Sequence, residues 1–166
     1  MLPVKERESV RKFLDSLTKE REMFTLSFEE ISESKFCFSE KKNGVIIGLV
    51  GILKNNQLFI VVKSEYQSRS LGHRLMAKVI NEAMERSYPY IDLMTFRCNK
   101  RAIRLYEEFG FKALFNDVKR DGRPICRMTK PLNFKGSVRL VLVQLLESFP
   151  HQVFRRFSKY TIRNIE

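Results

Sequence analysis

The most informative stretch of the sequence is VKSEYQSRSLGH, residues 62–73. A β-branched apolar segment, residues 58–63, leads into it, and its polar loop is followed by a helix that begins near Leu71. The first amides of a helix have no internal partner, and the helix dipole adds positive charge there, so this turn can bind a phosphate. Its small residues and its arginines suit that role: Ser70, Gly72, Arg69 and Arg74. The alternative is an ordinary strand-to-helix loop, because neither a Walker loop nor a G-x-G-x-x-G fingerprint is present.

Hydrophobic periodicity on either side of this stretch predicts further strands and helices. Apolar residues from Leu71 to Met84 share one helical face, and Tyr88-Pro89-Tyr90 ends that helix. Asn43-Gly44 fits a tight hairpin turn, and Gly110 is expected to end a helix. The expected elements are helices at 6–19, from 71 and at 99–109, and strands at 35–39, 45–53, 58–63, 91–96, 111–119 and 125–130. This order predicts an α/β (α+β) fold with a mixed central sheet flanked by helices.

The length of 166 residues fits one domain, expected at 1–132, and an extension of different character at 133–166. An apolar helix is expected at 137–148, followed by a basic and aromatic tail. The extension could pack on the domain, form a homodimer or touch a membrane surface, and the first two are preferred. The start of the chain lacks the apolar core of a signal peptide, and no apolar run reaches the roughly 18 residues of a spanning helix. We therefore expect a cytoplasmic protein without a membrane span.

The formal net charge is +12, with an isoelectric point near 9.8. A basic surface attracts anions such as nucleic acid, phosphorylated cofactors or acidic lipids, although it can also serve solubility alone. Cys37, Cys98 and Cys126 are scattered without a C-x-x-C pair, so reduced thiols are expected. His73 and His151 lie far apart without a nearby Cys or His, so no metal site is expected.

A second segment, NKRAIRLYEEFGF at residues 99–111, gives the sequence a family resemblance. It resembles the N-x-x-A-x-x-x-Y-x-x-x-G-F helix-to-strand motif of the GNAT N-acetyltransferase superfamily. The earlier turn, Gln67-x-x-Ser70-x-Gly72, resembles the Q/R-x-x-G-x-G/A pyrophosphate motif of the same superfamily, and the two motifs follow each other in the family's order. The resemblance covers roughly residues 35–130. Ser70 departs from the pattern because it replaces a glycine, so it is strained if its φ is positive.

The resemblance implies acetyl-CoA as cosubstrate, held without a metal between two splayed parallel strands, 58–63 and 91–96. Two backbone segments and one further residue would take part. The backbone of the strand at 60–62 would bond the pantetheine arm, the amides of 67–73 would hold the pyrophosphate, and Asn99 would bond the cofactor arm or a nearby backbone group. The implied cofactor-binding residues are Ile60, Val61, Val62, Gln67, Ser68, Arg69, Ser70, Leu71, Gly72, His73 and Asn99.

The resemblance also implies that Tyr106 is the acid that protonates the departing thiolate, whereas periodicity alone would make it a core aromatic. The base is open. Some relatives carry a glutamate where this chain has Met94, which cannot accept a proton. Asp92 lies two residues earlier on the same side of the strand and is the candidate. Glu65, His73 and a chain of waters are the alternatives.

We therefore predict an N-acetyltransferase that moves an acetyl group from acetyl-CoA to a primary amine by direct attack in a ternary complex. One alternative is a catalytically silent acyl-CoA-binding or regulatory domain. Another is a basic nucleic-acid-binding protein, motivated by the charge and the aromatic tail. The acceptor amine, a small molecule or a protein amine, is left open, and the apolar helix at 137–148 favours a homodimer.

Overall fold

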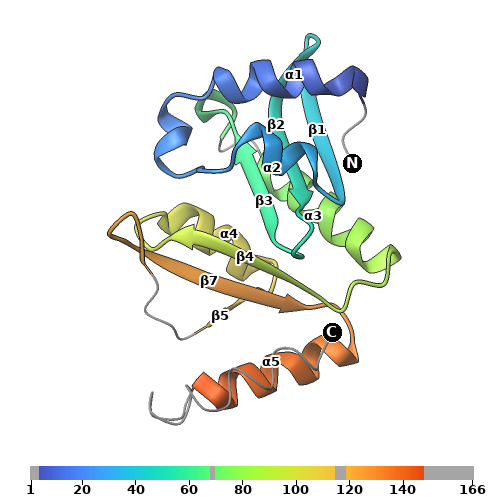
Figure 1. Ribbon diagram of the computed structural model, residues 1–166, viewed down its shortest axis with the longest axis vertical. Helices are drawn as coiled ribbons and strands as arrows, with labels where there is room; N and C mark the ends of the chain where they lie inside the picture. The colour runs from blue at the N-terminus through green and yellow to red at the C-terminus, as the bar shows by residue number, and fades with distance from the viewer. Residues whose placement is uncertain (1–3, 68–69, 115–118, 148–166) are drawn as a thin grey trace.

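The computed structural model describes residues 4–67, 70–114 and 119–147, and their strands form two antiparallel sheets (Figure 1). The first sheet has the order β1-β2-β3, with strands at Phe36–Lys42, Val45–Ile52 and Leu58–Val62. The second has the order β4-β7-β5, with strands at Tyr90–Phe96, Arg123–Pro131 and Lys112–Leu114, and the short β6 (Lys119–Arg120) pairs with β7. Helices flank both sheets, which confirms the predicted α/β (α+β) class.

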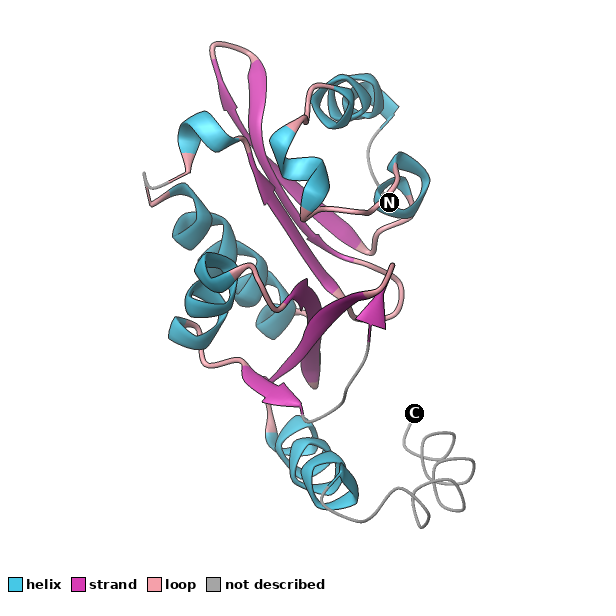
Figure 2. Cartoon of the chain, turned by 90° about the vertical axis from the view of Figure 1, so that its left-hand side faces the viewer, coloured by secondary structure: helices cyan, strands magenta, loops and turns pink. Residues whose placement is uncertain are grey.

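Helices cover both faces of the first sheet. Helices α1 (Val4–Asp15) and α2 (Phe28–Ser32) lie on one face, and α3 (Leu71–Glu85) lies on the other (Figures 1 and 2). Successive residues of β3 alternate between these faces, as strand geometry requires: Phe59 packs with the α1 side and Leu58 with the α3 side. The first sheet is therefore the middle layer between two hydrophobic clusters.

The segment before the first sheet differs from the prediction. The helix expected at 6–19 ends at Asp15 and is followed by a 3-10 helix, η1 (Lys19–Glu22). Helix α2 was not predicted, although its start carries a readable signal. Ser27 Oγ accepts from Glu30 N–H at 3.2 Å, and the Glu30 carboxylate accepts from Ser27 N–H at 2.8 Å. This Ser-x-x-Glu capping box fixes the beginning of a helix that is too short for a clear hydrophobic period.

Helix α4 (Lys100–Glu108) follows β4 and ends at Gly110, whose φ of +79° requires the freedom of glycine. Tyr106 of α4 packs in the same cluster as Leu93 of β4 and Met128 of β7. The strand expected at 111–119 is represented by β5 and β6, and residues 115–118 of that prediction lie outside the described residues.

Strands β3 and β4 run parallel but diverge. Within the described part of the chain, they meet at one bridge, Gln57 with Asp92, where Asp92 N–H donates to Asn56 O at 3.2 Å. Beyond this bridge each strand pairs only with its own sheet. The predicted pair of splayed parallel strands is therefore present.

Helix α5 (Phe134–Glu147) packs against β7 and β5 beyond the second sheet (Figure 2). It can approach closely because residue 136 is glycine: a Cβ there would lie 1.8 Å from Pro89 O. Its outward face is apolar, made of Phe134, Val138, Val141, Leu142 and Leu145. The expected homodimer stays a prediction, and the basic tail lies outside the described residues. No helix among the described residues is long and apolar enough to cross a bilayer.

Candidate active site

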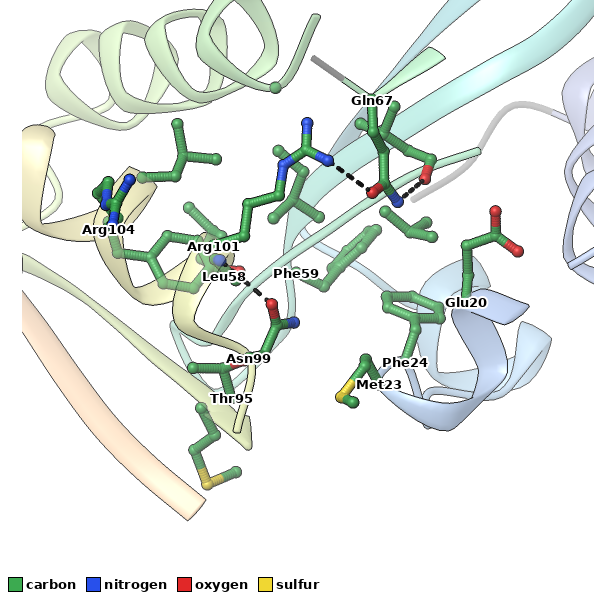
Figure 3. Close-up of a pocket in the computed structure, with 18 of the residues that line it drawn as sticks. Glu20, Met23, Phe24, Leu58, Phe59, Gln67, Thr95, Asn99, Arg101 and Arg104 are labelled. Carbon is green, nitrogen blue, oxygen red and sulfur yellow. Dashed lines mark hydrogen bonds between the residues drawn. The ribbon is translucent and has the colours of Figure 1, made fainter. Parts of the chain in front are cut away.

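A cavity of about 880 Å³ lies where β3 and β4 diverge (Figure 3). Its walls come from β3, β4, α3, α4 and the segment between α1 and α2. Glu20 and Phe24 of that segment lie on one side in Figure 3, and Arg101 and Arg104 of α4 lie on the other. The lining thus includes residues from both faces of the first sheet. The cavity therefore passes through the opening between the strands, so that two ligands can approach each other from opposite faces.

The edge of β3 that faces the cavity has free backbone groups. Lys63 N–H donates to Ile47 O at 3.0 Å, and hydrogen-bonding direction alternates along an antiparallel ladder. The odd-numbered residues of β3 therefore bond to β2. The even-numbered residues turn their backbone groups away from β2: Leu58 lies next to the bridge between Gln57 and Asp92, and Ile60 and Val62 face the cavity. Of the three residues predicted to bond a pantetheine arm, Val61 lines the cavity but turns its backbone groups to Leu49 of β2.

The predicted phosphate-binding turn forms the start of α3. The first helical bond runs from Arg74 N–H to Ser70 O at 3.0 Å, so the preceding amides have no carbonyl within the helix. Those amides belong to Leu71, Gly72 and His73. Ser70 has φ +56° and ψ 2°, the left-handed conformation in which a glycine is usual, so it carries strain. Ser68 and Arg69 of the predicted set lie outside the described residues.

The side chain of Gln67 forms hydrogen bonds to both β3 and α4. Its Nε2 donates to Val62 O at 2.9 Å, and its Oε1 accepts from Arg101 Nη1 at 3.2 Å (Figure 3). These two hydrogen bonds engage the Val62 carbonyl and link the end of β3 to α4. The Val62 N–H and both backbone groups of Ile60 remain turned to the cavity.

Asn99 and Tyr106 bring α4 to the cavity wall. The Asn99 Oδ1 accepts from Ala102 N–H at 3.2 Å and so caps the helix, as the sequence predicts. Tyr106 is buried beside Phe111, and burial raises the pKa of its hydroxyl well above the ordinary value. The hydroxyl is therefore protonated at neutral pH, which suits a proton donor and not a base.

The candidate bases lie elsewhere. Asp92 is not among the residues that line the cavity. It lines a smaller neighbouring pocket of about 310 Å³, and its carboxylate pairs with Arg139 at 3.1 Å. The structure thus places the predicted base away from the cavity. His73 lines the cavity, but its Nε2 lies 2.8 Å from Glu108 Oε2. Glu65 is exposed and is not among the lining residues.

Sequence reasoning missed Glu20, an acidic residue on the α1 side of the cavity. Its carboxylate accepts from Ser64 N–H and Thr18 N–H. Burial acts to raise its pKa, but the hydrogen bonds from Ser64 and other backbone amides outweigh burial, and the pKa lies below its ordinary value. No sequence pattern marks this residue, because only the folding of η1 against the end of β3 brings it to the cavity.

The chain belongs to the acetyltransferase (GNAT) family, whose model it matches over residues 6–111. The fold is similar to that of the ribosomal-protein-S18-alanine N-acetyltransferase from Escherichia coli. That structure has a TM-score of 0.63 and 22% identity, over 80% of this chain and 92% of that chain. It is also similar to spermidine N-acetyltransferase from Vibrio cholerae in complex with CoA and spermine. There the TM-score is 0.61 and the identity 18%, over 79% of this chain and 92% of that chain.

In sequence, 52 residues of the chain are 38% identical to an uncharacterized N-acetyltransferase of Dictyostelium discoideum. This match covers 31% of the chain and 24% of that protein, so the chain spans about a quarter of the length of this curated relative.

Proposed function

We propose that this protein is an N-acetyltransferase that moves an acetyl group from acetyl-CoA to a primary amine by direct attack in a ternary complex. The observation that carries the proposal is the single cavity through the splayed strands. On one side it joins the free amides of α3, the open edge of β3 and the buried Tyr106. On the other side it reaches the α1–α2 segment, which leaves a second entrance for the amine.

The chain's own groups fit acetyl-CoA. A volume of about 880 Å³ is within the range of sites for ligands of this size. The first-turn amides of α3 suit the pyrophosphate, because they donate hydrogen bonds at the positive end of a helix. The cavity-facing groups of Ile60 and the Val62 N–H suit the amides of a pantetheine arm, which would pair with β3 as an added strand would.

Acetyl-CoA would supply an activated thioester, in which a carbon–nitrogen bond forms to the amine while the carbon–sulfur bond breaks and the sulfur leaves as a thiolate. Tyr106 gives its hydroxyl proton to that sulfur and regains one from solvent. Its position on the cavity wall supports this role. Burial raises its pKa, so the hydroxyl holds its proton until a thiolate is present beside it. A cavity-facing N–H of β3 stabilises the charge that develops on the acetyl oxygen.

The amine must lose a proton before it attacks, because a lysine-like amine has a pKa of about 10.4. We propose that water on the α1 side carries this proton away. Glu20 contributes by charge: its lowered pKa keeps the carboxylate ionised, and the carboxylate attracts the ammonium form of the acceptor. Asp92 takes no part in proton transfer in this scheme, because Arg139 holds it outside the cavity.

The acceptor is proposed as an amine carried by an apolar group. Apolar side chains of the α1–α2 segment line the cavity beside Glu20: Met23, Phe24 and Leu26. Two of the similar structures are named for amine acceptors, an alanine of a ribosomal protein and spermidine. The family match and the cavity support acetyl transfer rather than the nucleic-acid alternative, and Tyr106 on the cavity wall argues against a silent binding domain.

An acceptor screen tests this proposal. The full chain is incubated with acetyl-CoA and, separately, a polyamine, an amino sugar, a lysine-containing peptide and a peptide whose only amine is its N-terminus. Release of CoA thiol and the mass of the product are measured. We expect one class to gain a single acetyl group. Binding of acetyl-CoA without transfer to any amine would instead support the silent acyl-CoA-binding domain.

A further inference from the structure

Two arginines of α4, Arg101 and Arg104, line the cavity near the phosphate-binding turn (Figure 3). They are three residues apart, so they project from the same side of the helix. Both stand at variable positions of the N-x-x-A-x-x-x-Y motif, so the motif assigns them no role.

Packing between α4 and α3 places these arginines beside the free amides. A Cβ on Gly72 would lie 3.3 Å from Leu105 Cδ2, and His73 Nε2 lies 2.8 Å from Glu108 Oε2. Leu105 directly follows Arg104 in the chain. The backbone of Arg104 therefore lies next to the first turn of α3.

Arg104 carries a positive charge that no carboxylate of the described residues pairs with. Arg104 has no hydrogen bond or ion pair anywhere in the described chain. The neighbouring carboxylate on the cavity wall, Glu108, is engaged with His73. A guanidinium presents parallel N–H donors that match phosphate oxygens. Arg104 is exposed on the cavity wall, so its guanidinium is free to receive an anion that binds there.

Coenzyme A carries two separate anionic groups, the pyrophosphate and the 3′-phosphate of its ribose. The amides of α3 suffice for the first and leave the second, with a charge near −2, in need of cations. We propose that Arg104, assisted by Arg101, binds the 3′-phosphate and makes the protein select coenzyme A over 3′-dephospho-CoA. This inference rests on the proposed function, because it assumes that coenzyme A occupies the cavity.

Calorimetric titration of the full chain with CoA and with 3′-dephospho-CoA tests the subsite. We expect wild-type protein to bind CoA about tenfold more tightly than 3′-dephospho-CoA, a preference that weakens with added salt. Arg104→Gln is expected to lose about tenfold in affinity for CoA and almost nothing for 3′-dephospho-CoA. Lys100→Gln is the matched control, because it removes the same charge from the same helix at a residue that does not line the cavity.

Three outcomes would overturn the inference. One is equal affinity of the wild-type protein for CoA and 3′-dephospho-CoA. Another is an equal loss of affinity for these two ligands in Arg104→Gln. The third is a loss of CoA affinity in Lys100→Gln as large as in Arg104→Gln. Arg104→Lys guards against a folding artefact, since it keeps the charge and should retain part of the preference. Absence of any CoA binding to wild-type protein is different, because it would overturn the proposed function itself.

Discussion

The guanidinium of Arg139 bonds both carboxylate oxygens of Asp92, with Nη2 3.1 Å from Oδ2 and Nη1 3.4 Å from Oδ1. The same guanidinium lies over the ring of Tyr90, with Cζ 3.7 Å from its centroid. The pair joins α5 to β4, and both side chains are mostly buried, at 24% and 22% exposure. Asp92 therefore links α5 to β4, and its carboxylate is engaged away from the cavity.

Asp92→Asn distinguishes a structural role of Asp92 from a role as the catalytic base. We expect it to lower the free energy of unfolding by about 1–2 kcal/mol, because it leaves Arg139 without its charge partner in a partly buried site. The turnover number should stay within about twofold, since removal of a catalytic base typically costs at least about 100-fold. Arg139→Met should cause a similar loss of stability, and the double variant should add little more. A large fall in turnover in Asp92→Asn alone would restore Asp92 as the base.

Tyr106→Phe should remove the proton donor while keeping the ring in the core. We expect the turnover number to fall by about 100- to 1000-fold, with acetyl-CoA affinity unchanged. The raised pKa of Tyr106 means that its acidic form persists as pH rises, so wild-type turnover should not fall between about pH 7 and pH 9 through this group. Stopped-flow or steady-state thiol release measures both effects. Tyr90→Phe is the control, because Tyr90 lies outside the cavity lining. Equal turnover in the two variants would refute the acid role.

Ser70→Gly should stabilise the protein. Ser70 has φ +56°, and relief of this conformation should raise the free energy of unfolding by about 0.5–1 kcal/mol. Ser70→Ala is the matched control: both variants lose the contact of Ser70 Oγ with Arg74 Nη1 at 3.4 Å, but only glycine relieves the backbone. Urea unfolding compares them. If the glycine variant were no more stable than the alanine variant, the turn would carry no strain from Ser70.

Glu20→Gln should weaken acceptor binding without affecting acetyl-CoA. The amide keeps an oxygen for the N–H groups of Ser64 and Thr18 but loses the charge. We expect the KM of a cationic acceptor to rise about tenfold. Glu22→Gln, on the same 3-10 helix but outside the cavity lining, should leave it unchanged. A matching rise in both variants would show a general surface effect.

The lowered pKa of Glu20 also predicts how the stability of the protein changes with pH. The pKa of folded Glu20 lies below the ordinary value of 4.5, so the folded state binds its proton less readily than the unfolded chain. Its contribution to stability is present above pH 4.5 and is lost as pH falls through the folded pKa. Thermal unfolding between neutral and acidic pH should thus show a shallower acid loss in Glu20→Gln than in the parent protein.

Local signals in the sequence predicted much of the fold and the cofactor side of the cavity. Periodicity predicted α3, and the turn and cap residues Asn43-Gly44, Asn99 and Gly110 marked real boundaries, because each acts through its own backbone. The acceptor side was not predictable in the same way. Glu20 reaches the cavity only because η1 packs near the end of β3. Asp92 pairs with Arg139, which is 47 residues away along the chain.

We propose that acetyl-CoA occupies the cavity with its pyrophosphate at the start of α3. Calorimetric titration with acetyl-CoA, in wild-type protein and in Gly72→Val, tests this binding mode. Gly72 lines the cavity in the first turn of α3, so a valine side chain there would occupy space beside the free amides. Its Cβ would also lie 3.3 Å from Leu105 Cδ2, so a small loss of stability is expected as well. We predict about micromolar binding to wild-type protein and its loss in Gly72→Val while the variant remains folded. No detectable binding of millimolar acetyl-CoA to the wild-type protein would contradict this binding mode.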